Sequence, residues 1–295
     1  MKIKTLVGGL LLVGLTQTSL MAEKSMEELS KEISNPLAQI WNLSFQNNYT
    51  TIKGDNVDGS EHINTTLFQP ILPIPLDDKW MFFARPVITY IDAPTGVAID
   101  VSNPNNPVAH GSNKHGDLGD TILPIGVGIV RKKGFSWGAG ATFIFPTSQH
   151  DLVASHQYQA GPTALALWAN DDWTIGAHGQ HWWGVTGDGK NVDINGNERK
   201  MANHTDIQYF IIYNLPHAWQ LRASPHITYN WNASHDNKLT LPVALGVGKM
   251  IKVGRMPIML MAEYQKSIVS PNRAGNDSTI MLQANFIIKN PFGDL

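Results

Sequence analysis

The stretch WQLRASPHITYNW, residues 219–231, alternates between apolar and polar residues along its whole length. Its polar or charged residues all take even positions, and its apolar residues take the odd positions: Trp219, Leu221, Ala223, Pro225, Ile227, Tyr229 and Trp231. Successive side chains of a β-strand point to opposite faces, so the pattern predicts a strand with one apolar and one polar face. The apolar face carries an aromatic residue at each end.

The same alternation recurs along the chain of 295 residues and predicts twelve strands. Some predicted strands are clear, some have small faults, and three have apolar residues on both faces. In chain order they are residues 42–51, 62–75, 80–90, 118–131, 135–145, 156–168, 173–185, 204–214, 219–231, 238–251, 258–267 and 278–288. The predicted fold class is therefore all-β.

The links between these strands alternate in length. Tight turns are expected at 76–79, 131–134, 170–172, 215–218 and 253–256, and longer polar links at 53–61, 95–117, 148–155, 187–201, 233–237 and 272–277. Short turns on one side and longer loops on the other are typical of an antiparallel up-and-down barrel in an outer membrane, with periplasmic turns and outward loops. We therefore predict a transmembrane barrel of about twelve strands.

The tryptophans favour a membrane barrel over a soluble one. All nine are predicted to lie near one of two levels, as in the aromatic girdles at the two membrane interfaces: Trp41, Trp80, Trp137, Trp168, Trp173, Trp182, Trp183, Trp219 and Trp231. A soluble periplasmic β-sandwich or a lipocalin-like barrel also alternates, but it would bury its large aromatic residues in mid-strand. The apolar face is thus expected in lipid and the polar face inside.

The N-terminus indicates export. Two lysines precede an apolar run that closes at Ala22, which predicts a signal peptide over residues 1–22. Cleavage there would lower the net charge from −2 to −4, because Lys2 and Lys4 are lost, and this balance gives no case for nucleic-acid binding, which would call for a basic patch. Cysteine is absent, which excludes disulfides, thiolate metal sites and cysteine nucleophiles.

Residues 23–41 are expected to form a periplasmic N-terminal segment ahead of a barrel over residues 42–295. Ser25 and Glu28 fit a capping box, and apolar residues recur after them at helical spacing, which predicts a short amphipathic helix. The helix has three possible positions: under the barrel, inside its lumen, or at the membrane interface. A simple periplasmic cap on the barrel is the plainest of these.

Polar side chains on the inward faces are candidates for lining the lumen. They are Arg85, Asp120, His178, Gln180, Asp206, Gln208, Arg222, His226 and Glu263. One interpretation is a mutually paired network that fills a narrow interior, because a buried charge without a partner is costly. The other is a constricted pore that selects solutes, in which partly free arginines form a positive ring that favours anionic or aromatic solutes.

Metal and enzyme functions have little support in the sequence. Six histidines fall in or near the long links: His110, His115, His150, His156, His181 and His235. No pair of them has the spacing of a helical metal site, so we predict no metal and no cofactor. A lipid-modifying enzyme of the outer membrane would need a serine, a histidine and an orienting group together. His110 and Ser112 lie close in sequence, but on a predicted loop, and no predicted strand presents such a triad, so we expect no enzyme activity and no catalytic residues.

Seven stretches together resemble one bacterial outer-membrane family. They are NPLAQIWNLSFQNNY (35–49), LFQPILPIPLDDKW (67–80), GDLGD (116–120), FPTS (145–148), GPTALAL (161–167), HWWGVTGD (181–188) and LPVALGVGKMIKVGRMPIML (241–260). The resemblance is to the meta-pathway phenol-degradation family, whose members are often labelled transporters or neuromedin U-like. It implies an outer-membrane barrel that passes small, aromatic or hydrophobic molecules. Two features depart from the family: Tyr209 follows Gln208 where a proline is common, and the aromatic Phe292 lies three residues from the end.

The sequence thus predicts a passive outer-membrane channel for small molecules, with membrane lipid and the barrel-assembly machinery as its partners. A structural or surface-interaction barrel with a blocked lumen is the alternative, and a lipid-modifying enzyme is a weaker one.

Overall fold

The computed structural model describes residues 24–35, 37–57, 59–95, 113–148, 155–187 and 201–292. In these ranges the chain forms one α-helix, sixteen β-segments and two 3-10 turns. In chain order they are α2 (Met26–Ile33), β1 (Trp41–Lys53), β2 (Glu61–Ile71), β3 (Ile74–Pro75), β4 (Trp80–Ala84), β5 (Ile88–Thr95), β6 (Asn113–Leu118), β7 (Thr121–Ile129), β8 (Gly134–Phe145), β9 (Gln157–Ala169), β10 (Trp173–Gly187), β11 (Asn203–Leu215), η1 (Pro216–Ala218), β12 (Trp219–Ala223), β13 (His226–Asn230), η2 (His235–Asn237), β14 (Leu239–Val253), β15 (Met256–Val269) and β16 (Gly275–Ile288).

The sixteen segments make twelve antiparallel spans, because four spans are each interrupted once. The breaks separate β2 from β3, β4 from β5, β6 from β7, and β12 from β13. Three of them hold a proline, which cannot donate to a strand ladder: Pro73, Pro86 and Pro225. The fourth holds Gly119 and Asp120. The predicted strands 62–75, 80–90 and 219–231 therefore exist, but each is broken at its proline.

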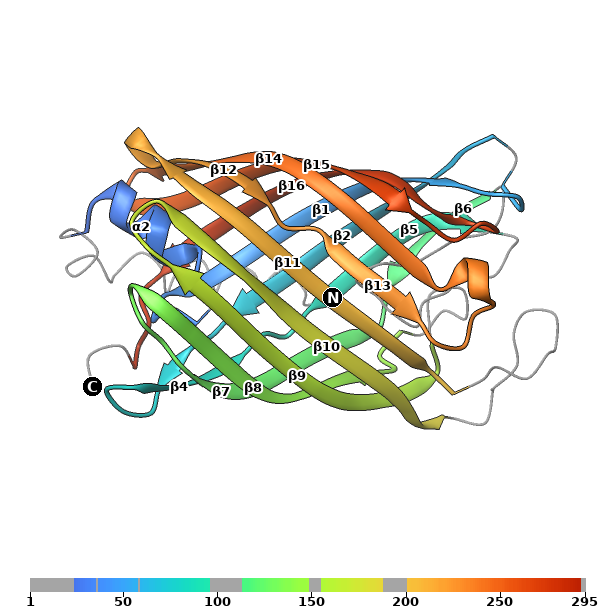
Figure 1. Cartoon of the computed structure of the whole chain (residues 1–295), viewed down its shortest axis with the longest axis horizontal. Helices are drawn as coiled ribbons and strands as arrows, with labels where there is room; N and C mark the ends of the chain where they lie inside the picture. The colour runs from blue at the N-terminus through green and yellow to red at the C-terminus, as the bar shows by residue number, and fades with distance from the viewer. Residues whose placement is uncertain are drawn as a thin grey trace, which may run out of the picture.

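The sheet closes on itself. β1 pairs along its length with β2 on one side and with β16 on the other, from Trp41 opposite Ile288 to Lys53 opposite Gly275. Every other span pairs with its neighbours in chain order. The prediction of an all-β, antiparallel up-and-down barrel is confirmed, and the strands wrap around one lumen (Figure 1). No helix among the described residues is long and apolar enough to cross a membrane.

The predicted link at residues 95–117 has wrong boundaries. Residues 95–117 were expected to form a loop, but β5 continues to Thr95 and β6 begins at Asn113, directly opposite Thr95 in the ladder. The alternation is weak there, because GDLGD and its neighbours carry few apolar side chains. The residues between these strands lie outside the described part of the chain, as does the expected signal peptide.

The alternation of faces follows the sequence. On β12, Trp219 and Leu221 are 45% and 42% exposed on the outer surface, whereas Gln220 is fully buried and Arg222 is 8% exposed on the inner one. The same holds on β10, where Ile175 points outward and Thr174 inward. Large apolar side chains on the outside and polar side chains on the inside are what a lipid-facing barrel wall requires.

Helix α2 lies at the end of the barrel that carries the tight turns, near η1 and β14 (Figure 1). Its capping box is formed: the Ser25 hydroxyl accepts from the Glu28 N–H, and the Glu28 carboxylate accepts from the Ser25 N–H. These bonds satisfy donors that the first turn of a helix would otherwise leave free. The hydrogen-bonded carboxylate of Glu28 has a pKa below its usual value of 4.5, mainly because the Ser25 backbone N–H stabilises the charged form.

Candidate functional site

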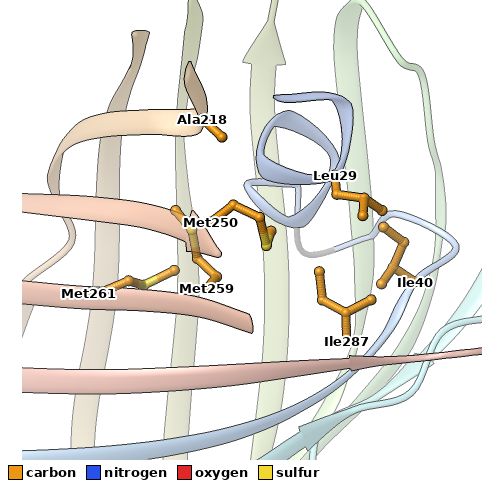
Figure 2. Packing of buried hydrophobic residues seen from close by; sticks show 7 residues of the cluster. All are labelled: Leu29, Ile40, Ala218, Met250, Met259, Met261 and Ile287. Carbon is orange, nitrogen blue, oxygen red and sulfur yellow. The ribbon is translucent and has the colours of Figure 1, made fainter. Parts of the chain in front are cut away.

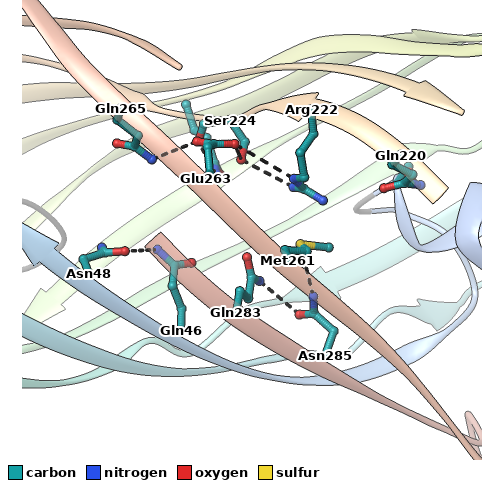
Figure 3. Close-up of polar contacts among 12 residues, drawn as sticks. Gln46, Asn48, Gln220, Arg222, Ser224, Met261, Glu263, Gln265, Gln283 and Asn285 are labelled. Carbon is teal, nitrogen blue, oxygen red and sulfur yellow. Dashed lines mark hydrogen bonds and ion pairs between the residues drawn. The ribbon is translucent and has the colours of Figure 1, made fainter. Parts of the chain in front are cut away.

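The inner wall of β12 and β15 holds a charged cluster (Figure 3). The Nε atom of Arg222 lies 4.0 Å from the Oε2 atom of Glu263, and both side chains are almost fully buried. The Glu263 carboxylate also accepts a hydrogen bond of 3.0 Å from the Ser224 hydroxyl and one of 2.9 Å from the Gln265 amide. Arg222 is therefore one half of a buried pair, which limits its action as a free positive charge.

Arg85 has a different environment. Among the described residues it forms no ion pair, and its guanidinium donates through Nε and Nη2 to the Oε1 atom of Gln69, at 3.1 and 2.5 Å. Gln69 in turn donates to Gln46, and Gln46 to Asn48, at 3.1 and 3.0 Å. The arginine thus heads a chain of amides along the wall, and its own charge is not neutralised by a bonded carboxylate.

The two remaining predicted charges are held by other partners. Asp206 is fully buried, and its Oδ1 atom lies 2.7 Å from Nδ1 of His226. Asp120 is also fully buried, at the break between β6 and β7, where it accepts from the backbone N–H groups of Ser148 and Ser155 and from the Ser155 hydroxyl. Asp120 therefore ties strand ends together.

The other predicted lumen residues are also inward. The His178 ring lies 2.8 Å from the Thr163 hydroxyl, and the Gln180 amide oxygen accepts from the Thr142 hydroxyl at 2.9 Å. Gln208 donates to the backbone carbonyl of Ser224 at 3.2 Å. The nine predicted side chains thus face the interior as several small bonded groups, not as one ring.

The N-terminal segment, residues 24–35 and 37–40, packs into the turn end of the lumen. Leu29 and Ile40 lie against inward-facing Met250, Met259 and Ile287 (Figure 2). Gln220, on the inner face of β12, donates to the Ser30 carbonyl and to the Ser34 hydroxyl, both at 2.8 Å. The helix is therefore bonded to the barrel wall as well as packed on it, and sequence reasoning had left its position open.

Leu37 extends the N-terminal segment across the lumen, so that this segment forms a plug at the turn end. It is 1% exposed and packs in a cluster of inward-facing apolar residues, namely Phe83, Leu165, Leu167, Ala169, Phe210 and Ile212. Full burial of such a leucine stabilises the contact by about 1.5–3 kcal/mol. The turn end of the interior is consequently apolar and occupied.

Trp182 was predicted in an aromatic girdle, and that assignment is wrong. Its side chain is fully buried inside the barrel, where it stacks on His204 with ring centroids 4.9 Å apart and donates to the Thr142 hydroxyl at 3.1 Å. It packs in an inner cluster with Leu67, Val87, Ile122 and Ile144. The even position of Trp182, which it shares with His178 and Gln180, is the signal that identifies its inward face.

The other eight tryptophans have exposed or half-buried side chains on the outer surface. Exposed fractions of 38–51% are found for Trp137, Trp168, Trp173, Trp183, Trp219 and Trp231, while Trp41 and Trp80 are half-buried. Several contact aromatic neighbours: Trp80 meets Trp137 edge to face, with ring centroids 5.9 Å apart, and Trp173 lies tilted against Tyr213 at 4.6 Å. Their strand positions next to turns and links are those expected of interfacial aromatics.

The described residues enclose narrow cavities in the interior, of which two bear on the site. The first, of about 50 Å³, is lined mainly by polar side chains of β1, β11, β13, β15 and β16, among them Gln46, Gln208, His226, Gln265 and Gln283. The second, of about 40 Å³, lies between Leu37 and the wall and is bordered by Arg85 and His178. Each has room for only a few water molecules.

No group of three or more histidine, cysteine or acidic side chains suited to a metal ion occurs among the described residues. Of the histidines considered from the sequence, His110 and His150 lie outside the described residues, as does Ser112. His181 bonds to Thr205 at 2.8 Å, and His235 to Asp236 at 2.9 Å. These histidines therefore serve local contacts.

Comparison with known proteins gives a structural answer only. No protein-family model matches the sequence, and no curated protein matches it. An outer-membrane channel from Pseudomonas putida F1 superimposes with a TM-score of 0.62 at 12% identity, over 84% of this chain and 94% of that one. The NanC porin gives a TM-score of 0.49 at 13% identity, over 84% of this chain and 99% of that one. The CymD monoaromatic hydrocarbon channel gives 0.44 at 9% identity, over 88% and 92%. The first comparison shows that this chain has the fold of an outer-membrane β-barrel.

Proposed function

We propose that the chain is a passive outer-membrane channel for small molecules, including aromatic or hydrophobic compounds. The observation that carries the proposal is the closed barrel with an outer apolar wall and an inner wall that carries Arg85 on a chain of hydrogen-bonded amides and Arg222 paired with Glu263. Polar side chains of this kind can line a path for solutes.

The fold comparison supports the same function. The structure that superimposes with a TM-score of 0.62 is that of an outer-membrane channel. The sequence resemblance to the meta-pathway phenol-degradation family adds the solute class, small aromatic or hydrophobic molecules. Under this proposal residues 1–22 are removed on export, the barrel-assembly machinery inserts the chain, and the N-terminal segment lies on the periplasmic side.

Arg85 is the residue that we assign to solute selection. It lines the second cavity and forms no ion pair among the described residues, so it attracts anions or the electron-rich face of an aromatic ring. His178 and Gln208 border the same cavity and offer hydrogen bonds. A phenolate or a small aromatic acid has the chemistry that these groups recognise.

Conductance of the purified protein in a planar bilayer tests the proposal. Discrete, reproducible channels, together with uptake of a small aromatic acid into liposomes at a rate above that of protein-free liposomes, are the expected result. A folded barrel that neither conducts nor passes solute, even after the N-terminal segment is deleted, would contradict a channel function.

A second candidate is a structural or surface-interaction barrel with a blocked lumen. The observation in its favour is the filled interior: the N-terminal segment closes one end, and the cluster around Trp182 occupies one side. The deletion experiment separates the two functions, because a lumen blocked throughout stays silent when the plug is removed. We propose no enzyme activity and no cofactor.

A further inference from the structure

The outer surface carries a groove where the barrel wall is closed. The groove crosses β14, β15, β16, β1 and β2, which lie side by side (Figure 1), and has a volume of about 610 Å³. Each of these spans is paired with its neighbour without interruption in this region. The groove is therefore a feature of the lipid-facing surface and not an entrance to the lumen.

Small side chains form the floor of the groove. In one row across the ladder Ala284 lies between Leu260 and Phe45, and in the next row Ala262 faces Leu282. Leu260, Phe45 and Leu282 are 43%, 48% and 54% exposed, so they stand higher than the two alanines. The result is an apolar trough bordered by large apolar side chains.

The dimensions of the groove suit a lipid chain. Four steps between neighbouring strands separate β14 from β2, and at about 4.8 Å per step they make the groove roughly 19 Å long. The hydrocarbon of one membrane leaflet is about 15 Å thick. A single acyl chain that lies along the groove therefore has a matching length and apolar chemistry.

A positive charge marks the end of the groove nearest the tight turns. Lys249 lines this end, is half-buried and faces Trp219 in the ladder. Its ammonium lies 4.9 Å from the centre of the Trp219 ring and donates to the carbonyl of His217, and among the residues that the structure describes it forms no ion pair. Tryptophan is favoured at the level of lipid headgroups, so the protein holds this lysine where a lipid phosphate would lie.

A second depression joins the groove at Lys249. It has a volume of about 530 Å³, and Lys249, Lys252, Ser25 and Glu27 are among the residues that line it. Glu27 is the acidic residue of this lining, and its carboxylate accepts a hydrogen bond of 2.7 Å from the His217 N–H. Two lysines outweigh one carboxylate, so the depression favours a headgroup with a net negative charge.

The other end of the groove needs no polar partner. Asn47 and Thr66 line it, and the Asn47 amide donates to Asn64 at 2.6 Å and to Thr66 at 3.0 Å. Polar side chains in the middle of a membrane often hold two protein surfaces together by hydrogen bonds. Here both N–H groups of the Asn47 amide are already used within the barrel, which favours an apolar lipid chain over a second copy of the protein.

We propose that the groove and the adjoining depression bind one anionic phospholipid, with its phosphate at Lys249 and one acyl chain over Ala262 and Ala284. In the orientation given under the proposed function, this lipid belongs to the periplasmic leaflet. The site lies on the outer surface and does not depend on whether the lumen passes a solute.

Native mass spectrometry of the purified full-length barrel tests the site. The protein is stripped of lipid in detergent and then incubated with palmitoyl-oleoyl phosphatidylglycerol. One lipid should stay bound after the detergent is removed in the spectrometer, whereas a diacylglycerol with the same two chains, which lacks the phosphate, should be retained severalfold less. Lys249→Gln removes the charge and Ala284→Phe fills the groove, so each should lower the retained fraction of phosphatidylglycerol severalfold.

Three further variants serve as matched controls. Lys79→Gln removes an exposed lysine at another tight turn, and Ala177→Phe adds the same ring on the outer face of β10, away from the groove. Both should retain the lipid as the unmodified protein does. Lys249→Arg keeps the positive charge and should retain most of the lipid.

Each alternative outcome overturns a stated part of the site. Equal retention by the groove variants and their controls would leave only a general lipid coat, and equal retention of diacylglycerol would remove Lys249 from recognition. A second protein copy in place of the lipid, lost in Ala284→Phe, would make the groove an interface between copies. If Lys249→Gln does not fold, the comparison of Ala284→Phe with Ala177→Phe decides.

The lipid site and the channel function fail separately. A barrel that conducts but retains no phosphatidylglycerol would contradict only the lipid site. A barrel that retains the lipid but neither conducts nor passes solute would contradict only the channel.

Discussion

At the scale of single residues, the face that a side chain occupies could be predicted because a strand has period two. Arg85, His178, Asp206 and Arg222 face inward as their parity requires. Their partners could not be predicted, because the pairing of Arg222 with Glu263 depends on how two non-adjacent strands are staggered in the closed barrel. The girdle position predicted for Trp182 is wrong for another reason. It rests only on the position of Trp182 along the strand and not on the face of the sheet to which the side chain points.

The orientation of the wall predicts a large difference between neighbouring residues on β16. Leu282 is 54% exposed on the outer surface, whereas Gln283 lines the larger cavity. Leu282→Arg should cost about 2–4 kcal/mol, because it places a charge in mid-bilayer, while Gln283→Arg should cost much less. Folding titrations in lipid vesicles measure both costs, and equal costs would contradict the assignment of Leu282 to the lipid face and Gln283 to the lumen. Ser224 is a poorer inward control, since it hydrogen-bonds to Glu263.

The two arginines should differ when each is replaced. Arg85→Gln should lower the anion preference in reversal-potential measurements and leave the barrel folded, because the buried Asp206 keeps its contact with His226. Arg222→Gln should mainly destabilise, since Glu263 stays buried without its counter-charge, and Arg222→Gln with Glu263→Gln should recover that stability. Unchanged selectivity in a folded, conducting Arg85→Gln variant would remove Arg85 from solute selection.

At the scale of elements, strand positions were largely predictable and breaks were not. Alternation continues across Pro225, so residues 219–231 look like one strand, yet the missing N–H group ends the ladder there. The capping box correctly predicted helix α2. Its docking position could not be predicted, because the helix is amphipathic whether it lies in a membrane interface or in a barrel mouth.

The N-terminal segment should control conductance. Leu37→Ala leaves a cavity among Phe83, Leu165 and Phe210 and should weaken docking by about 2–5 kcal/mol. The open state should then be more frequent in single-channel records, and deletion of residues 23–39 should give a larger, steady conductance. Lys24→Ala, at an exposed residue of the same segment, is the control. Identical records for all variants would show that the segment does not obstruct the path.

Acid should weaken the docking of the N-terminal segment. The pKa of Glu28 is lowered in the folded state by the Ser25 N–H, so its capping contribution is full above its usual value of 4.5 and is lost as the pH falls through the lowered value. Channel opening should therefore increase as the pH is taken from 5 toward 3. Glu28→Gln should remove that part of the pH response, because glutamine does not titrate; a persistent response would assign it to another acid.

At the scale of the whole molecule, closure of the barrel depends on contacts between the start of β1, the residues after β16 and the break between β2 and β3. Asn290, which is buried just after β16, donates to the carbonyls of Gln39 and Pro73, at 3.2 and 2.9 Å. Trp41 donates to the same Pro73 carbonyl at 2.9 Å, and its ring lies 6.0 Å from that of Phe292. A polar residue thus joins β1, the β2–β3 break and the end of β16.

Asn290→Ala should therefore destabilise the closed barrel as a whole. It removes one of the two donors to the buried Pro73 carbonyl and the donor to the Gln39 carbonyl, which costs about 0.5–1.5 kcal/mol per hydrogen bond, and it frees the last residues beside β16. The loss should appear as a lower temperature for the gel-mobility shift between folded and unfolded barrel. Lys252→Ala, at an exposed residue near a tight turn, should leave that temperature unchanged. Hydrogen exchange shows whether the effect is local. If Asn290→Ala weakens only the pairing of β1 with β16, the first and last strands, these two strands should lose protection from exchange while the other spans keep it. If the contact between β1 and β16 holds the whole barrel together, all twelve spans should lose protection from hydrogen exchange equally. Loss of protection in β1 and β16 alone would contradict this prediction.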